Sequence, residues 1–330
     1  MNTQTKRHWP QPNWWWPFAA GVLVGIALRL VFSARPGEPL ETMSGSFAVL
    51  APTVVGAVTV YVAELRARHT WLYYFGIAAL TNILFVLGTF LILIEGAICV
   101  IVAAPMFGLL GGLAGLLAGG ACRLSRRWMR PTVYSLAVLP VLLGHVESQL
   151  PLPRQISTIE RSLTVAATPA DVWTQLTTAP DIRPEEIGDG WMYRIGVPLP
   201  ESAITHTADG AVVRHIRMGK GVQFDQVAAE WEPARRVRWL YRFTPDSFPP
   251  RALDDHVRIG GEYFDIIDTE YSLQAQADGT TTLRVAMSYR VSTRFNWYAG
   301  RVAGLLVGNF EETALRFYAR RAEAHVVPRR

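Results

Sequence analysis

Long apolar runs separated by short polar breaks fill the first 150 residues, whereas the remainder mixes polar and apolar positions throughout. A helix needs about 20 apolar residues to cross ~30 Å of hydrocarbon, and the third and fourth runs clearly reach this length. Only Glu95 and Gly96 separate these two runs, so the chain must turn back there to stay within the bilayer. The pattern predicts an all-α transmembrane bundle of about five helices within residues 1–150, at 18–31, 47–62, 71–94, 97–121 and 133–146.

Lysine and arginine are concentrated before the first run and in every second connection between the runs. Short loops rich in the two residues stay on the cytoplasmic side of a membrane. With five spans, the outer segments hold only Arg29 and Arg35, and the cytoplasmic ones hold Lys6, Arg7, Arg66, Arg68, Arg123, Arg126, Arg127 and Arg130. We expect an integral inner-membrane protein of bacterial type, with a cytoplasmic N-terminus and with residues 151–330 outside the cytoplasm.

The fifth run is the weakest of the predicted spans. It is short, contains Pro140 and runs into His145 and Glu147, so a re-entrant or interfacial segment is the alternative. In that case residues 151–330 lie in the cytoplasm.

A stripe of small residues marks the fourth run. Gly111, Gly115 and Gly119 recur at every fourth position, which lets two helices approach closely. Packing within the bundle is the simpler interpretation, and a homo-oligomer through this stripe is the alternative. No Asp, Glu, Lys or His lies in the middle of a run, which disfavours an ion or proton transporter.

Alternating polar and apolar positions predict antiparallel strands in the second half of the chain. In three of these strands the apolar face holds Val237, Trp239, Tyr241 and Phe243; Ile267, Tyr271 and Leu273; and Leu283, Val285, Met287, Tyr289 and Val291. A helix is expected to start at Thr168, which can cap it, followed by Pro169. The chain ends in a long helical pattern expected to cover the sheet, with an apolar stripe of Trp297 or Tyr298, Val302, Leu306, Phe310, Ala314 and Phe317.

Three glycines in the C-terminal helical pattern leave two interpretations open. Gly300, Gly304 and Gly308 each weaken a helix by about 1 kcal/mol relative to alanine, so something must compensate. Close packing against the sheet is one explanation. Room for a ligand beside the helix is the other.

The order of these elements, with "TPADVWTQL" near the start and "SYRVSTRFNWYAGRVAGLLVGNFEETALRFYARRAE" at the end, resembles the SRPBCC superfamily. This superfamily includes START lipid-transfer domains and polyketide cyclases, and the resemblance covers residues 155–325. It implies an α+β helix-grip fold, in which an antiparallel seven-stranded sheet wraps around a long C-terminal helix and encloses a mostly apolar cavity. No catalytic signature of the superfamily can be carried over to this chain, and residues 1–150 lie outside the resemblance.

Charge and cysteine usage exclude several classes of function. Of the 32 Lys and Arg and 27 Asp and Glu, the second half carries 22 of each, so the basic excess belongs to the membrane half. A soluble half without net charge does not have the basic surface that nucleic-acid binding requires. Cys99 and Cys122 both lie in the fourth run or at its edge, so the soluble half has no thiolate metal site. We expect no cofactor and no metal.

Few residues of the second half are candidates for acid–base chemistry. His206, His215 and His256 do not have the spacing of a helical metal pair, and a surface or structural role is the simpler interpretation for each. Asp254, Asp255 and His256 form the densest cluster of potential ligands, within a 245–261 insertion expected to act as a flap with Phe248, Pro249 and Pro250 at its tip. A basic run comprises Arg214, Arg217, Lys220, Arg236, Arg238 and Arg242, and either forms a solvated sheet face or partly holds an anionic ligand group.

These observations favour a membrane-anchored module that binds an apolar or amphipathic small molecule such as a lipid. The residues expected to line its cavity are Trp239, Tyr241, Phe243, Tyr271, Met287, Tyr289, Val302, Leu306 and Phe310. One alternative is an enzyme resembling polyketide cyclases, for which His215 and Tyr241 are the catalytic candidates. Another is a ligand sensor that signals through the membrane bundle.

Overall fold

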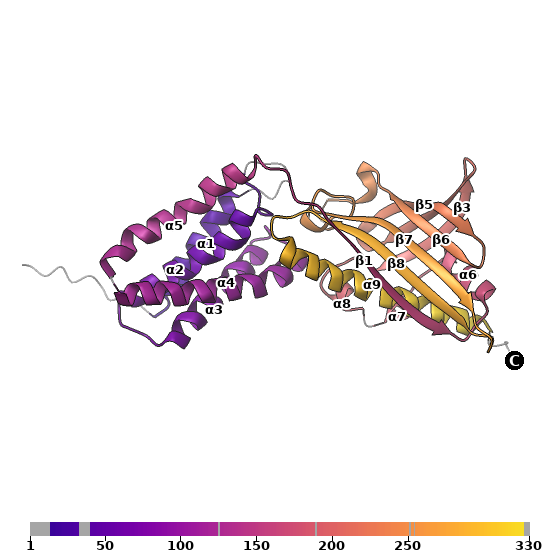
Figure 1. The fold of residues 1–330 in the computed structure, drawn as a ribbon, viewed down its shortest axis with the longest axis horizontal. Coiled ribbons are helices and arrows are strands. Elements are labelled where there is room, and N and C mark those ends of the chain that lie inside the picture. Colours follow the sequence, from indigo (N-terminus) through magenta and orange to yellow (C-terminus); the bar gives the residue numbers. More distant parts are fainter. Residues whose placement is uncertain are drawn as a thin grey trace, which may run out of the picture. The chain divides into compact units, whose positions relative to one another are not determined.

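The computed structural model describes residues 14–32, 40–124, 126–188, 190–250, 252–253 and 255–326. The chain divides into two compact units, and Figure 1 follows them by colour along the sequence. Met1–Gly96 and Val100–Pro151 make up the helical unit, and Ala97–Cys99 with Leu152–Arg330 make up the sheet unit.

The helical unit contains α1 (Trp16–Val31), α2 (Ala51–Glu64), α3 (Trp71–Leu91), α4 (Ala97–Leu124) and α5 (Arg126–Glu147). A π-helical turn, η1 (Ser46–Leu50), leads directly into α2. By length and composition, three of the described helices could cross a membrane: Ser46–Glu64, Trp71–Leu91 and Ala97–Leu124. The apolar helices Trp16–Val31 and Ser135–Glu147 are shorter, and these are the first and fifth of the predicted spans.

Side-chain contacts at the two ends of the helical unit show that its helices alternate in direction. At one end Arg29 of α1 forms a 2.6 Å ion pair with Glu95, which follows α3. Glu147, at the end of α5, accepts 2.8 Å hydrogen bonds from the backbone of Ser46 and its neighbour at the start of η1. At the other end Arg123 of α4 donates to the carbonyl of His69 between α2 and α3 at 2.7 Å.

The glycine stripe of α4 packs inside the helical unit. A Cβ added at Gly111 would lie 1.9 Å from the Asn82 amide nitrogen on α3, and one at Gly119 would lie 2.3 Å from the Tyr74 ring. A Cβ at Gly56 on α2 would lie 2.3 Å from the Gly111 carbonyl oxygen. These glycines of the stripe therefore pack against neighbouring helices of the same chain, as the simpler of the two interpretations expects.

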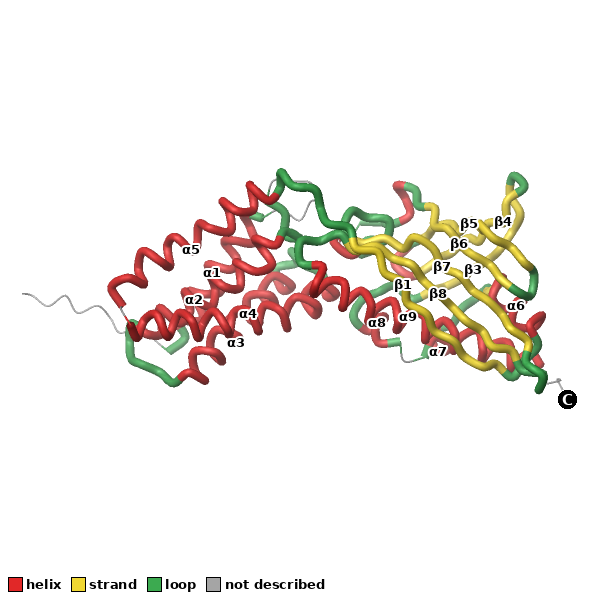
Figure 2. Tube along the Cα trace, viewed as in Figure 1, coloured by secondary structure: helices red, strands yellow, loops and turns green. Residues whose placement is uncertain are grey.

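The described residues of the sheet unit form one antiparallel sheet of eight strands in the order β1-β8-β7-β6-β5-β4-β3-β2. Figure 2 shows in yellow how this sheet curls. The strands are β1 (Gln155–Val165), β2 (Thr178–Ala179), β3 (Pro200–Ala208), β4 (Ala211–Met218), β5 (Gln223–Glu232), β6 (Arg236–Arg242), β7 (Phe264–Ala275) and β8 (Thr281–Val291). The prediction of seven strands was wrong by one, because the two residues of β2 are too few to leave an alternating pattern.

Helices cover the inner face of the sheet. The long helix α9 (Asn296–Val326) packs against β1, β8 and α6 (Pro169–Thr177), and the one-turn helices α7 (Pro184–Ile187) and α8 (Trp191–Arg194) flank it. The start of α6 follows the sequence prediction, since Thr168 caps it by accepting a 3.3 Å hydrogen bond from the Asp171 amide. A curled antiparallel sheet around a long C-terminal helix is a helix-grip fold.

The space between sheet and α9 is filled by inner-facing strand residues. Val237, Trp239, Leu283 and Val285 have no exposed surface, as the alternation in their strands predicts. Ile267 departs from its predicted place, because a β-bulge between Ile266 and Asp268 shifts the register of β7 against β8 and leaves this side chain exposed.

The three glycines of α9 let the helix approach the strands closely. A Cβ at Gly300 would lie 3.0 Å from the Gln155 amide nitrogen, one at Gly304 would lie 3.2 Å from the Tyr289 hydroxyl, and one at Gly308 would lie 3.4 Å from the Arg161 guanidinium. Of the two interpretations left open by the sequence, these distances favour close packing.

Candidate functional site

Four polar side chains form a row across the inner face of the sheet, one from each of four neighbouring strands. Arg214 on β4 pairs in register with Gln226 on β5, which in turn pairs with Tyr241 on β6. The Tyr241 hydroxyl lies 2.8 Å from the Thr269 hydroxyl on β7. These strands place every second side chain toward α9, and the row follows from that alternation. We call Arg214, Gln226, Tyr241 and Thr269 the polar row.

Arg214 is a buried cation with 3% of its surface exposed. Its Nη2 donates a 2.5 Å hydrogen bond to the Tyr318 hydroxyl on α9, and its guanidinium carbon lies 5.8 Å from the ring centroids of Trp239 and Tyr318. Its Nε has no hydrogen-bond partner, and no carboxylate among the described residues forms an ion pair with it. An arginine stays charged in proteins. Cation–π contacts worth about 1–2 kcal/mol offset only part of the several kcal/mol that burial of a charge costs.

The tyrosines around Arg214 are neutral hydrogen-bonding groups. Burial raises the pKa of Tyr241 to about 12, although hydrogen bonds with Thr269 and Gln226 act in the opposite direction. Burial also raises the pKa of Tyr271 well above its usual range. Both phenols therefore keep their protons at physiological pH and can donate hydrogen bonds.

Glu311 on α9 is a second buried charged residue of the interior. It is 0% exposed, and within the described part of the chain neither carboxylate oxygen has a hydrogen-bond partner of ordinary geometry. Burial raises the pKa of Glu311 to about 7, against the opposite effects of the Arg161 charge and of the Met287 backbone amide. At neutral pH this carboxyl is divided between its protonated and ionised forms.

An aromatic cluster closes the end of the interior next to the polar row. The Phe224 ring lies 5.7 Å from Tyr241 and 5.5 Å from Phe243, and Phe243 lies 5.5 Å from Phe248 in the segment between β6 and β7. Ala252 of this segment is buried in the same cluster. The segment expected to act as a flap thus lies against inner-facing residues of β5 and β6.

The residues expected to line a cavity lie in three parts of the interior. Trp239 and Tyr271 belong to the main core, whereas Tyr241 and Phe243 belong to the aromatic cluster. Met287, Tyr289 and Phe310 pack together with Val307 of α9.

Two of the predicted helix residues do not lie where the stripe placed them. Val302 and Leu306 are only half-buried, while the neighbouring Ala303 and Val307 are buried. The buried face of α9 is therefore rotated by about one residue from the predicted stripe, because the helix approaches the strands through its glycines.

The two catalytic candidates lie on opposite faces of the sheet. Tyr241 points into the interior, whereas His215 alternates to the outer face and its Nδ1 lies 2.9 Å from the Asp225 carboxylate. The Arg242 guanidinium lies 2.9 Å from the same carboxylate. The structure does not bring His215 and Tyr241 together in one site.

The other two candidate histidines, His206 and His256, lie in different environments. His206 is exposed, while His256 is buried with its ring 6.1 Å from that of Tyr263. Asp254 lies outside the described residues, and so does the side chain of Asp255. Within the described part of the chain, no three His, Cys, Asp or Glu side chains lie close enough to hold a metal ion.

Arg236, Arg238 and Arg242 of the basic run lie on the outer sheet face and are paired with carboxylates. Arg236 forms ion pairs with Glu270 at 2.8 Å and with Glu230 at 3.2 Å, and Arg238 lies 3.4 Å from Glu230. Arg214 differs from the others because it alone in the run points inward.

The sequence analysis did not identify four polar residues of the interior as candidates: Gln226, Thr269, Glu311 and Tyr318. A signal for Arg214 was present, because in "AVVRHIRM" it shares its alternation phase with Ile216, which packs against the core. Thr269 likewise shares the phase of Tyr271 and Leu273. A polar residue at an inward position is the informative observation, because such positions normally hold apolar side chains.

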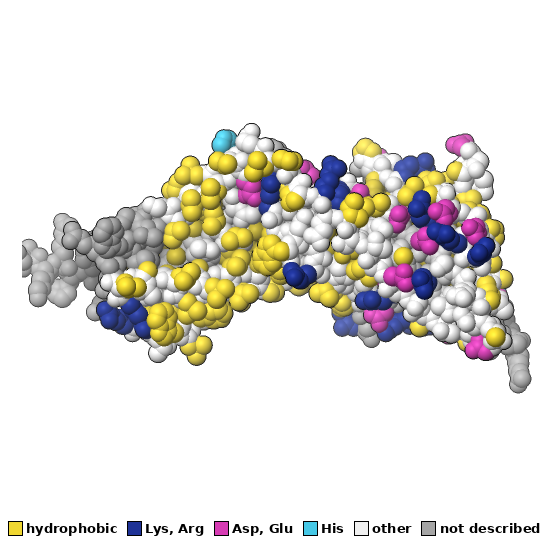
Figure 3. Space-filling view, in the orientation of Figure 1, with side chains coloured by type: hydrophobic (Ala, Val, Ile, Leu, Met, Phe, Trp, Pro, Cys, Tyr) yellow, Lys and Arg dark blue, Asp and Glu magenta, His cyan; other side chains and the backbone are white. Residues whose placement is uncertain are grey.

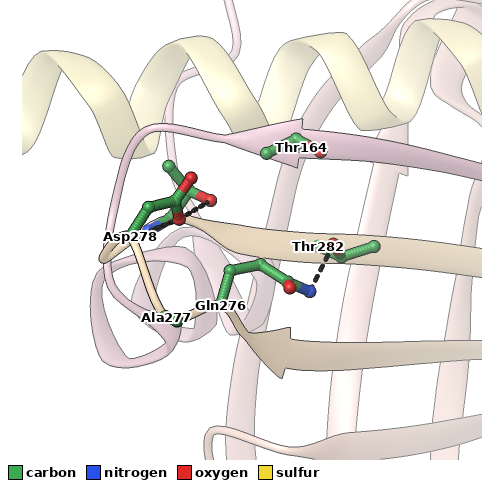
Figure 4. A pocket seen from close by; sticks show the side chains of 6 residues that line it. Thr164, Gln276, Ala277, Asp278 and Thr282 are labelled. Carbon is green, nitrogen blue, oxygen red and sulfur yellow. Dashed lines mark hydrogen bonds between the residues drawn. The ribbon is translucent and has the colours of Figure 1, made fainter.

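A shallow hollow near the β7–β8 turn lies apart from the polar row (Figure 4). It is lined by Thr164, Gln276, Ala277, Asp278, Thr280 and Thr282. The Gln276 amide donates to the Thr282 hydroxyl at 2.9 Å, and Thr280 donates to the Asp278 carboxylate through its hydroxyl at 2.7 Å. Gln276 and Thr282, and likewise Asp278 and Thr280, are thus hydrogen-bonded to each other, unlike the unpartnered polar atoms of the interior.

No protein-family profile and no curated protein matches the sequence. Among solved structures, norcoclaurine synthase from Thalictrum flavum is 12% identical over 55% of this chain and 99% of its own, with a TM-score of 0.33. The Zhui aromatase/cyclase of a Streptomyces species is 16% identical over 52% of this chain and 96% of its own, with a TM-score of 0.31. A Staphylococcus aureus protein of unknown function is 11% identical over 53% and 98% of the two chains, with a TM-score of 0.35. At these values the helix-grip assignment rests on this chain's own sheet and helix.

Proposed function

We propose that the sheet unit binds an apolar or amphipathic small molecule between its sheet and α9, and that the helical unit anchors it in a membrane. The observation that carries this proposal is a set of buried polar atoms that face the interior and have no hydrogen-bond partner among the described residues: Arg214 Nε, Gln226 Oε1, Trp239 Nε1 and the two Glu311 carboxylate oxygens. A core that serves stability alone satisfies its buried polar groups, because each unpaired one costs about 1–3 kcal/mol. Groups left unpaired inside an aromatic shell are suited to a ligand that has polar and apolar parts.

The apolar part of such a ligand would lie among the aromatic side chains of the interior. Removal of apolar surface from water stabilises a complex by about 25 cal/mol per Å². Tyr241, Phe243 and Phe224 supply such surface beside the polar row, and Phe248 of the overlying segment would cover the bound molecule. We propose that this segment opens for ligand entry.

Membrane anchoring is supported by the surface of the helical unit. Large apolar side chains are exposed along α3 and α4, among them Leu72, Leu91 and Leu117. Figure 3 shows many hydrophobic side chains on the visible face of this unit, whereas charges of both signs are spread over the sheet unit. An exposed apolar surface of this extent is suited to lipid contact.

We propose the sidedness of the protein from its basic residues. Arg66 and Arg68 follow α2 and Arg123 ends α4, so they share one end of the helical unit, while α5 ends at the opposite end beside Ser46. We assign the arginine end to the cytoplasm, and on this assignment the sheet unit lies outside the cytoplasm.

A C-terminal reporter active only outside the cytoplasm should give a signal. Silence of that reporter in an expressed fusion would assign the sheet unit to the cytoplasm.

The function can be tested by identifying the small molecules that co-purify with the full-length chain, using native mass spectrometry from detergent micelles. Ala228 is half-buried against the core, whereas the next residue, Ala229, is exposed. Ala228→Trp should therefore displace the bound molecule, and Ala229→Trp should keep it. The proposal is wrong if the wild-type chain carries no small molecule and also takes up none on exposure to lipid extracts.

An enzymatic role has one specific observation in its favour. A carboxyl with a pKa of about 7, such as that of Glu311, suits general acid–base catalysis at neutral pH. Once a ligand is identified, its chemical conversion by the wild-type chain and the loss of that conversion in Glu311→Gln would support this role. An unchanged ligand after prolonged incubation would leave the binding role alone.

A further inference from the structure

We infer that the polar row binds an oxyanion of the ligand, a carboxylate or a phosphate group, with Arg214 as its counter-charge. This inference rests on the proposed binding function and names the chemistry of the ligand's polar end. A ligand with such a group would direct its charged end to Arg214 and its apolar chain to the aromatic cluster.

The first argument is the charge balance around Arg214. Its guanidinium is buried beneath α9, and its partners in the described chain are the neutral Tyr318 hydroxyl and two aromatic rings. A buried guanidinium is stable in proteins when a carboxylate or phosphate matches its forked donors. Because no such group of the chain pairs with it among the described residues, an anion of the ligand is the chemistry that fits.

Glu311 does not serve as the missing partner. Its carboxylate forms no ion pair with Arg214, and the charge that most stabilises its ionised form is that of Arg161 on the edge strand β1, from which four strands separate β4. Glu311 also lies beside Met287 on β8, whereas Arg214 lies on β4. The two buried charged residues are therefore separate features of the interior.

The second argument is the chemistry of the groups around Arg214. Tyr318, Tyr241 and Thr269 carry hydroxyls that can donate, and burial keeps the Tyr241 phenol protonated by raising its pKa to about 12. Gln226, whose Oε1 is unpartnered, can present its amide nitrogen instead by rotation of the amide. An acceptor-rich group such as an oxyanion can use all of these donors, whereas a ligand hydroxyl can use few.

The outer face of β4 supplies a matched control. Arg217 lies three residues from Arg214 on the same strand, but its side chain is exposed. Arg217→Gln and Arg214→Gln remove the same charge from the same strand, on its outer and inner face respectively. Only the inner substitution should change ligand selectivity.

The test measures binding of matched ligand pairs to the full-length chain in detergent at pH 8.5, by native mass spectrometry. One pair is hexadecanoic acid and hexadecanol, which tests a free carboxylate. The other is palmitoyl lysophosphatidic acid and monopalmitoylglycerol, which tests a lipid phosphate. The ratio of the affinities within a pair, compared between proteins in the same detergent, corrects for partition into the micelle.

We expect the wild-type chain to bind the anionic member of at least one pair tenfold or more tightly than its neutral partner. Arg214→Gln should reduce this ratio to near one with little effect on the neutral ligand, Arg214→Lys should keep part of it, and Arg217→Gln should leave it unchanged. If Arg214→Gln does not fold, Tyr318→Phe provides the second variant, because it keeps the cation and removes the hydroxyl that orients it. It should lower the ratio several-fold.

The outcomes separate the inference from the function on which it rests. Preference within the first pair identifies a carboxylate ligand, and preference within the second identifies a phosphate headgroup. Equal binding of both members of both pairs by the wild-type chain, or an unchanged ratio in Arg214→Gln, would overturn the oxyanion site while the binding function stands. If no member of either pair binds and no small molecule co-purifies, the proposed function fails, and the inference fails with it.

Discussion

The buried charged side chains of the two units differ in whether they have partners. In the helical unit, Arg29 is 6% exposed and is paired with Glu95, and the buried Glu64 accepts a hydrogen bond from Tyr74. In the sheet unit, Arg214 and Glu311 are as deeply buried, yet each has polar atoms without a hydrogen-bond partner among the residues that the structure describes. A buried pair holds helices together, whereas an unpaired buried charge lowers stability and is a candidate for ligand contact.

Breaking the paired charge should have the largest effect. In Glu95→Ala the guanidinium of Arg29 stays buried at the end of α1 without its carboxylate partner. Removal of one partner of a buried ion pair destabilises a protein by about 3–5 kcal/mol. We expect a loss of this size in the free energy of unfolding, measured by titration with a denaturing detergent in mixed micelles.

The double variant Arg29→Leu with Glu95→Leu serves as the control for this prediction. Replacement of both partners removes the unpaired charge, so the variant should recover most of the stability that Glu95→Ala loses. Equal stability of Glu95→Ala and the wild-type chain would show that the pair does not hold the helices, and the comparison between the units would then no longer hold.

The unpaired carboxyl of Glu311 should make stability depend on pH. Its pKa is raised from 4.5 to about 7 in the folded chain, so the unfolded chain releases the proton first as pH rises. The free energy of unfolding should therefore fall between pH 4.5 and pH 7, by at most about 3 kcal/mol, and level off above pH 7. Glu311→Gln should remove this slope and be the more stable protein at pH 8.

The neighbouring Glu312 provides the control, because it lies on the same helix but is exposed and pairs with Arg316. Glu312→Gln should keep the slope of the wild-type chain. A wild-type chain whose stability is flat from pH 4.5 to pH 7 would contradict the prediction, because Glu311 would then be ionised at little cost in the folded state.

The substitution Arg214→Met should act in the direction opposite to Glu95→Ala. Methionine keeps the apolar stem of the side chain and removes an unpaired buried charge, so the ligand-free chain should gain about 1–2 kcal/mol. Thermal unfolding of delipidated wild-type and variant protein measures this. A lower unfolding temperature in the variant would mean that the contacts of Arg214 with Tyr318 and Trp239 are a net source of stability.

The sequence predicted the elements of the sheet unit well because strand alternation is a strong signal. Trp239, Leu283 and Val285 are buried as expected, since each strand has one apolar face. Arg214 was grouped with a basic run for which a solvated sheet face and a contact with an anionic ligand group both stayed open, because arginine is rarely buried. Its alternation phase nevertheless pointed inward. Nothing in the alternation shows whether an inward arginine finds a partner, because its contacts come from α9, far away in the sequence.

Helical patterns were less informative than strand patterns. The stripe through Val302 and Leu306 missed the buried face of α9 by about one residue, because the glycines that let the helix approach the strands carry no hydrophobic signal. In the helical unit, apolar residues lie on all sides of α3 and α4, so hydropathy predicts the helices but not which side chains meet. Glu95 was recognised only as a break between two runs, and its pairing with Arg29 depends on the three-dimensional packing.

The smallest effect is expected where α9 approaches the strands. In Gly304→Ala the new Cβ would lie 3.2 Å from the Tyr289 hydroxyl and 3.6 Å from Ile159. Both neighbours are ends of side chains that can shift by a few tenths of an ångström, and alanine favours the helix by about 1 kcal/mol. The two effects nearly cancel, so the free energy of unfolding should change by less than about 1 kcal/mol.

Gly56→Ala, whose Cβ would lie 2.3 Å from a backbone oxygen of α4, should lower the free energy of unfolding by more. If both substitutions had equal effects, helix packing in the two units would be equally tight, and the two units would differ only in how they pair their buried charges.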